Sequence, residues 1–320
     1  MTRELDDRAP TERRRGAIKA AALVLTALVL AAGSAQATHD PDPFPQAPGA
    51  ETRRLNLRLF DAAEKGETAT VADLLAKGAS TRARDRFGNT ALLRAARTGK
   101  TRTVKALLEA NSEIDQQNLN GSTALLRAAT ASRNRTVKAL VAAGAKVNLA
   151  NHGGITPIIA SAYNGDDRLV ELLLENGADP NAVDRTGKTA MFYAAGRGFA
   201  GIVGMLHAAG VDVNLALGND LTALMWAAGF SNDVPPAEGL ATVSLLLGLG
   251  AEVNRRDNRG RTALMTAAER DYAEVVDILI KAGARPGIED TEGKTARDLA
   301  SAAGSLDAIK ALGAAGSAKP

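Results

Sequence analysis

The order of apolar and polar positions in residues 90–111 predicts two short helices. Residues 90–96 read TALLRAA, and residues 104–108 read VKALL. Apolar residues that recur three and four positions apart lie on one face of a helix. Gly99 stands between the two runs and indicates a turn. The pattern therefore predicts a helix, a turn and a second helix, each with a single apolar face.

This pattern recurs with a period of 33 residues. The T-A or T-P dipeptides that open each run begin at Thr90, Thr123, Thr156, Thr189, Thr222, Thr262 and Thr295, and only the fifth spacing, of 40 residues, departs from the period. The threonine hydroxyl is expected to cap the first helix of each unit. A glycine ends most second helices, and Asn111 takes its place once, as expected for a left-handed residue. One unit buries too little apolar surface to fold alone, so stacked units are expected to share a core.

Turn-forming residues precede each threonine. An aspartate or asparagine is followed three residues later by glycine, which is typical of a tight turn. The first residues of these turns are Asp85, Asn118, Asn151, Asp184, Asp257 and Asp290. In the fifth unit the corresponding positions are Leu217 and Asp220, so an irregular turn is expected there.

The complete unit resembles the ankyrin repeat. The resemblance implies an all-α repeat solenoid of stacked helix-turn-helix units with short β-hairpin fingers, covering residues 55–318. We expect an N-terminal capping unit, six full repeats and a C-terminal cap, with an insertion near residues 229–240 whose role is open. The family's T-P-L-H motif is altered, because the histidine position holds Leu93, Leu126, Ile159, Phe192, Met225 and Met265.

The N-terminus has the layout of a secretory signal peptide. A basic stretch precedes the apolar residues 20–32, and Ala35 and Ala37 form an A-x-A cleavage pattern. Thirteen apolar residues are too few for a membrane-spanning helix. We expect residues 1–37 to be removed and the protein to be periplasmic or secreted from a bacterium, by either the general or the twin-arginine route. Residues 38–54 contain four prolines and are expected to form a linker.

Composition restricts the chemistry of the chain. Of the 320 residues 45% are hydrophobic but only 3% aromatic, and there is no cysteine and only three histidines. Disulfides and thiolate metal sites are therefore excluded. The net charge of +3 is no argument for nucleic acid, although residues 51–110 carry an excess of six positive charges. We expect no metal, no cofactor and no nucleic-acid partner.

Two apparent nucleotide motifs are explained by the repeat. Residues 196–201 read GRGFAG, but they fall at the turn between two short helices rather than after a strand. Three GKT triplets lack the glycine that a phosphate loop needs five residues earlier. No nucleophile–base arrangement is recognisable, so no catalytic residue is assigned and the chain is not expected to be an enzyme.

The resemblance implies a concave partner-binding surface made of the fingers and the exposed positions of the first helices. Aromatic and arginine side chains, which dominate interface hot spots, gather at these positions. The candidates are Arg86, Phe87, Arg94, Arg97, Arg127, Tyr163, Asn164, Tyr193, Arg197, Trp226, Phe230, Arg259 and Arg270. Whether Tyr193 and Trp226 contact a partner or pack between repeats is open at this point.

The expected function is that of a monomeric, non-enzymatic module that binds another protein, as an adaptor, an inhibitor or a chaperone-like scaffold. Two alternatives remain. The basic N-terminal repeats suit an envelope-associated role on anionic lipid or polysaccharide. The other alternative is an effector secreted into a host cell, which failure of the first 37 residues to deliver a reporter to the periplasm would favour.

Overall fold

The structure, a computed structural model, describes residues 49–231 and 233–317. The predicted signal peptide with its cleavage site at Ala35 and Ala37, and residues 38–48 of the predicted linker, lie outside the described residues. The described residues form sixteen helices that follow one another as eight pairs. Their bounds are α2 Ala50–Lys65, α3 Thr68–Ala76, α4 Ala91–Arg97, α5 Thr101–Glu109, α6 Ala124–Thr130, α7 Asn134–Ala142, α8 Pro157–Asn164, α9 Asp167–Glu175, α10 Ala190–Gly196, α11 Ala200–Ala208, α12 Ala223–Ala228, α13 Pro236–Gly248, α14 Ala263–Glu269, α15 Ala273–Lys281, α16 Ala296–Ala303 and α17 Leu306–Ser317.

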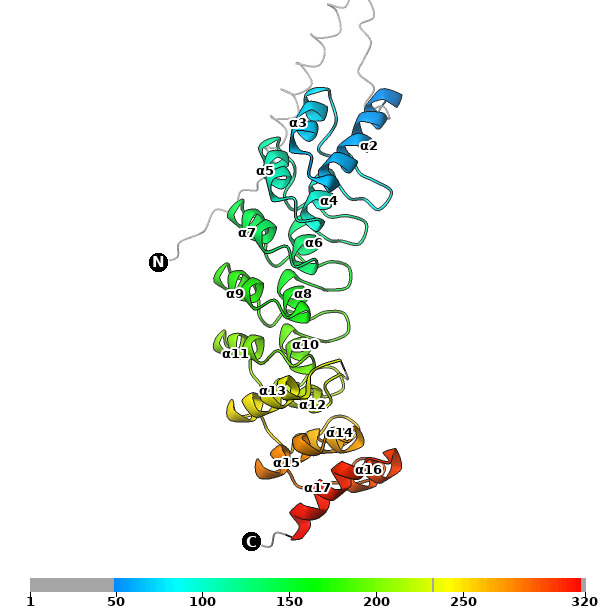
Figure 1. Ribbon diagram of the computed structural model, residues 1–320, viewed down its shortest axis with the longest axis vertical. Helices are drawn as coiled ribbons and strands as arrows, with labels where there is room; N and C mark the ends of the chain where they lie inside the picture. The colour runs from blue at the N-terminus through cyan, green and yellow to red at the C-terminus, as the bar shows by residue number, and fades with distance from the viewer. Residues whose placement is uncertain (1–48, 232, 318–320) are drawn as a thin grey trace, which may run out of the picture. The chain divides into compact units, whose positions relative to one another are not determined.

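The helices lie in two rows. The first helices of the pairs, α2 and then α4 to α16 by even numbers, contact one another in order, and the second helices α3 to α17 do the same. Figure 1 shows the connecting turns extending beyond the first row, on the side away from the second row. The predicted all-α repeat solenoid is thus confirmed.

Small side chains let the two rows pack closely. The alanine pairs of the first helices are essentially inaccessible to solvent, as at Ala95 and Ala96. Leu92 in α4 and Val104 and Leu107 in α5 are also fully buried. One continuous apolar core runs from α2 to α17, which explains why no unit needs a core of its own.

The capping residues act as the sequence predicts. Each repeat threonine except Thr189 accepts a hydrogen bond from the backbone N–H three residues later, at 3.2–3.5 Å. Asn111 has a positive φ of 59°, like the glycines at the same place in other repeats. The helix ends are therefore fixed by local sequence.

The fingers are tight turns rather than the β-hairpins that were predicted. In the first finger Asp85 Oδ1 accepts from the backbone N–H of Phe87 and of Asn89. Two backbone bonds close the turn, from Asp85 N–H to Asn89 O and from Gly88 N–H to Asp85 O, and this is too little pairing for a strand. Within the described residues a single β-bridge occurs, between Leu217 and Leu221 in the irregular fifth finger.

Backbone bonds join most neighbouring fingers. The N–H of Leu119 donates to Phe87 O at 3.1 Å, and the equivalent bonds recur from His152, Arg185, Asn258 and Thr291. The series is interrupted between the fourth and fifth fingers, where no such bond is formed among the described residues. The interruption coincides with the finger that has lost its aspartate and glycine.

One predicted boundary differs in the structure. Helix α2 begins at Ala50, so residues 50–54 are helical and not linker. The last proline of that region is Pro48, and Glu51 suits the first turn of a helix. The insertion is divided between a short connection and the start of α13, which has 13 residues where the other repeat second helices have nine. No helix among the described residues is long and apolar enough to cross a membrane.

Candidate functional site

The fingers and first helices form one face of the stack, which we call the finger-side face. Among the hollows on the described part of this face are an arginine pocket and an aromatic pocket. The arginine pocket, of about 590 Å³, lies over α2, α4 and α6 and is lined by Glu64, Asp85, Phe87, Asn89, Leu93, Arg94, Arg97, Asn118, Leu119, Asn120 and Arg127. The aromatic pocket, of about 630 Å³, lies over α8, α10 and α12 and is lined by Tyr163, Lys188, Phe192, Tyr193, Gly196, Arg197, Trp226, Gly229, Ser231, Asp233 and Arg270.

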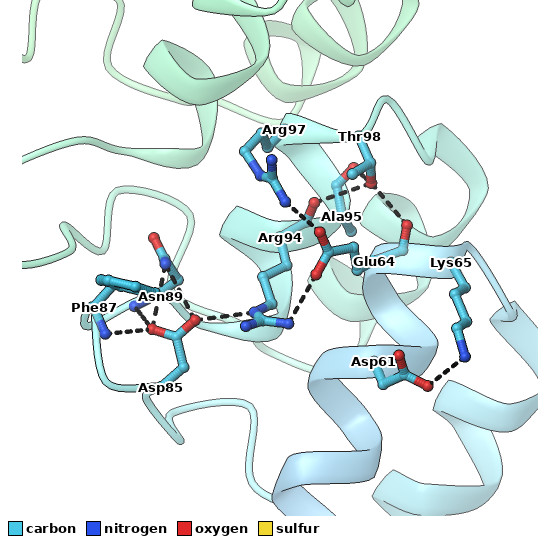
Figure 2. Close-up of polar contacts among 10 residues, drawn as sticks. All are labelled: Asp61, Glu64, Lys65, Asp85, Phe87, Asn89, Arg94, Ala95, Arg97 and Thr98. Carbon is cyan, nitrogen blue, oxygen red and sulfur yellow. Dashed lines mark hydrogen bonds and ion pairs between the residues drawn. The ribbon is translucent and has the colours of Figure 1, made fainter.

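Ion pairs hold Arg94 and Arg97 of the arginine pocket in place (Figure 2). Arg94 joins three elements, because its guanidinium lies 2.8 Å from Glu64 in α2 and 3.0 Å from Asp85 in the first finger. Arg97 pairs with the other oxygen of Glu64. The hydroxyl of Thr98 donates to Glu64 O at 2.9 Å. The pocket wall is therefore a structural network that holds the capping helix to the first repeat.

Burial and neighbouring groups shift the pKa values of two residues in the arginine pocket. Burial opposes the ionisation of Asp85, but hydrogen bonds from Asn89, Phe87 and Arg94 outweigh it and lower the Asp85 pKa. Arg127 has no carboxylate within ion-pair distance among the described residues, and burial followed by repulsion from Arg97 lowers its pKa. The arginine pocket therefore neutralises Arg94 and Arg97 but not Arg127.

Four rings and three cations line the aromatic pocket. Tyr163 meets Tyr193 edge to face at 5.5 Å between centroids, and Phe192 meets Trp226 in the same way at 6.4 Å. Lys188 lies 5.2 Å from the centre of the Trp226 ring. Ring faces attract cations, and the guanidinium of Arg197 similarly lies 4.7 Å from the Tyr163 ring.

A strong hydrogen bond fixes Tyr193. Its hydroxyl donates to Asp184 Oδ2 at 2.6 Å. Burial, together with this bond to a carboxylate, raises the pKa of Tyr193 to about 12. Burial opposes the ionisation of Asp184, but the bonds from Tyr193, Lys188 and Thr186 outweigh it and lower its pKa. The ring is therefore held in one orientation.

The structure separates the sequence candidates into groups. Phe87, Arg94, Arg97 and Arg127 line the arginine pocket, with Arg86 stacked on Phe87 at its edge. The candidates that line the aromatic pocket are Tyr163, Tyr193, Arg197, Trp226 and Arg270. Tyr193 and Trp226 are half-buried, so each packs between repeats and also presents part of its surface to the pocket.

Three candidates have structural roles. Asn164 donates from its amide to the backbone of α6, at Thr130 O, and so braces two repeats. Arg259 pairs with the buried Asp257 of its own finger at 3.1 Å. Phe230 is not on the surface as expected. It is 4% exposed and stacks on Tyr272 at 4.4 Å, because Gly239 leaves room for its ring.

Sequence reasoning missed several pocket residues. Glu64 comes from the capping unit, which lacks the repeat motif, so the sequence contains no sign of its pairing with Arg94. Lys188 and Asp233 reach the aromatic pocket from a finger and from the insertion. The last residue of each finger precedes the capping threonine, and this fixed position could have identified Lys188.

A basic surface lies on the second helices. Arg102 and Lys105 of α5 and Arg135 and Lys138 of α7 are exposed, and the two helices are packed neighbours. None of these four forms an ion pair within the part of the chain that the structure describes. Part of the positive charge expected for residues 51–110, at Arg102 and Lys105, therefore lies away from the finger-side face.

Comparison with known proteins agrees with this architecture. The family described as "Ankyrin repeats (3 copies)" matches residues 59–151, 158–234 and 236–319. The chain is also similar to the proteins named "Ankyrin repeat domain-containing protein 63" of Homo sapiens and Mus musculus, with 43% identity over 60 residues in each case. These 60 residues are 19% of this chain and only 16% and 15% of the two relatives. Among residues 49–231 and 233–317 there is no cluster of side chains suited to a metal ion.

Proposed function

Because this chain belongs to the ankyrin-repeat family, we propose that it binds another protein along its finger-side face and carries out no catalysis. The observation that supports this most is the exposure of large apolar side chains on that face. Phe87, Leu119 and Tyr163 are 54%, 68% and 49% exposed. Exposed apolar groups rimmed by polar residues mark interaction sites.

Through this contact the protein acts as an adaptor, an inhibitor or a chaperone-like scaffold. We place this activity in the bacterial periplasm or the surrounding medium, after removal of residues 1–37, with the protein acting as a monomer. The export segment supports this location, and the continuous core of the stack makes a second subunit unnecessary for folding.

Crosslinking in the native cell tests the proposal. The tagged full chain is expected to give a discrete crosslinked protein, and Tyr163→Ala is expected to reduce its yield severalfold. Arg168→Ala is the matched control, because Arg168 is exposed on α9 of the same repeat but on the opposite row. Circular dichroism checks that both variants fold. Equal yields from the two variants contradict the proposal.

A second candidate function rests on the basic surface of α5 and α7. We propose that these helices attach the protein to an anionic lipid surface, since their unpaired cations are available for lipid headgroups. Such attraction is screened by salt.

Vesicle sedimentation distinguishes this second function. Binding to vesicles with anionic lipid, but not to neutral vesicles, is expected, with loss at high salt. Arg135→Glu is expected to weaken it, whereas Arg168→Glu, at the same helix position one repeat later, changes it little. Equal effects of the two substitutions exclude α7 as the contact.

A further inference from the structure

The aromatic pocket contains buried donors that lack acceptors. Trp226 Nε1 and Arg197 Nε are both inaccessible to solvent and have no hydrogen-bond partner within the described residues. A buried indole N–H usually finds an acceptor, and leaving such a donor unpaired is costly. Arg127 Nε in the arginine pocket is unpaired in the same way, so it is the charge of the aromatic pocket, together with these donors, that points to an acceptor group from outside the chain.

The pocket also has a positive charge that its own residues do not neutralise. Lys188, Arg197 and Arg270 line it, and none of them is ion-paired in the part of the chain that the structure describes. Among the described lining residues Asp233 alone is acidic; its carboxylate accepts from Ser231 of the same loop and attracts Arg197 without forming an ion pair. In the arginine pocket, by contrast, Glu64 and Asp85 pair with Arg94 and Arg97, and only Arg127 is left without an ion pair within the described residues.

Ring faces hold two of these cations in place. Lys188 lies over Trp226 and Tyr193, at 5.2 and 5.9 Å from the ring centres, and Arg197 lies over Tyr163 and Phe199. A cation on a ring is oriented, but it keeps its full charge. The cations are therefore positioned to receive an anionic group from outside the chain.

We propose that the aromatic pocket binds an aromatic residue that bears a neighbouring carboxylate, supplied by the partner protein. The ring of the ligand packs against Tyr163 and Trp226, and its carboxylate accepts from Arg197 and Lys188. The pocket volume of about 630 Å³ suits one side chain and its flanking backbone. The proposal rests on the proposed function and specifies what the finger-side face recognises.

The tryptophan of the pocket provides a direct measurement. Trp226 is the only tryptophan of the chain, so tryptophan fluorescence of the intact protein reports on this site alone. N-acetylphenylalanine is titrated against N-acetylphenylalaninamide, a matched pair that differs in the carboxylate. The acid is expected to give a saturable change, with affinity about tenfold higher than that of the amide, because a charge-assisted bond is lost in the amide. Acetate alone and inorganic phosphate alone are expected to bind more weakly than the acid.

Variants assign the contact. Arg197→Gln and, separately, Lys188→Gln are each expected to weaken binding of the acid severalfold, while Arg168→Gln leaves it unchanged. If Arg197→Gln disturbs the fold because the packing of Arg197 is lost, Lys188→Gln still tests the carboxylate contact. The proposal is overturned if acid and amide bind equally, if neither gives a saturable change, or if phosphate alone binds as tightly as the acid.

Crosslinking separates this inference from the proposed function. Saturating N-acetylphenylalanine is expected to reduce the yield of the crosslinked partner. A partner that is captured equally with and without the acid, and whose capture still depends on Tyr163, leaves the finger-side face as the binding surface and overturns the carboxylate site.

Discussion

The hydroxyl of Tyr193 donates a 2.6 Å hydrogen bond to Oδ2 of Asp184, which ties the exposed side of α10 to the finger before it. Asp184 also accepts from the backbone of Thr186 and Lys188, so one carboxylate orders both the finger and a wall of the aromatic pocket.

Because the pKa of Tyr193 is raised, the stability of the fold depends on pH in the alkaline range. The pKa in the folded state is about 12, above the ordinary value of 10.0. The contribution of the hydrogen bond is therefore complete below pH 10 and is lost as the pH rises towards 12. Tyr193→Phe is expected to lower the free energy of unfolding by about 1–2 kcal/mol at neutral pH. In urea titrations the difference from the wild type should shrink between pH 10 and 12, and a constant difference contradicts the assignment.

Tyr193→Phe also changes how the free energy of unfolding falls at acid pH. The pKa of Asp184 is lowered in the fold, so its contribution is present above the ordinary value of 3.8 and is lost as the pH falls through the folded value. Without the Tyr193 donor the Asp184 pKa rises towards its ordinary value. Below pH 3.8, stability should fall less steeply with decreasing pH in Tyr193→Phe than in the wild type.

Removal of Arg94 should loosen the N-terminal end of the stack. Arg94→Met leaves Glu64 and Asp85 without their shared cation, and the Asp85 side chain is only 7% exposed. A loss of about 1–3 kcal/mol in the free energy of unfolding is expected. The control is Arg82→Met, whose pair with Glu113 is largely exposed and should contribute less than about 1 kcal/mol. Equal losses would mean that the network does not hold α2.

Two glycines of α13 form a matched pair. A Cβ at Gly239 would lie within 2.7 Å of three carbons of the Phe230 ring, whereas a Cβ at Gly248 meets nothing within 4 Å. Gly239→Ala is expected to cost about 1–3 kcal/mol through overpacking. Gly248→Ala is expected to be neutral or stabilising by up to about 1 kcal/mol. Thermal unfolding of both variants checks this, and a stable Gly239→Ala protein would show that the Phe230–Tyr272 stack can shift.

Export is testable from the cleavage pattern. Mass spectrometry of the exported protein is expected to find Thr38 at its N-terminus. Ala35→Glu together with Ala37→Glu should leave the precursor uncut and associated with the membrane. A mature protein that still carries residues 1–37 would contradict the assignment.

The fold could be predicted because its determinants are local and repeat in register. The capping threonines, the turn aspartates and the left-handed Asn111 each act within a few residues, so a single period reveals them all. Figure 1 shows the regular stack that results.

The site could be predicted only in part, because its contacts depend on side-chain direction and on distant residues. Arg94 pairs with a glutamate 30 residues earlier, in a helix that lacks the motif. Phe230 belongs to the insertion, where the period gives no register, and the space left by Gly239 turns its ring inwards. The repeat period therefore places most of the candidates on one face, but it does not show which of their side chains are engaged in contacts within the chain.

The interrupted series of finger bonds has a mechanical consequence. Backbone bonds from finger to finger resist sliding of one repeat past the next, and they are missing between the fourth and fifth fingers. At that junction the two repeats are joined by the contacts of α10 with α12 and α13, by those of α11 with α13, and by one backbone bond from Ser231 N–H to Gly196 O at 3.4 Å. Tension along the stack should therefore concentrate there, beside the aromatic pocket, so a pull on either end would change the shape of that pocket before it disturbs the remainder.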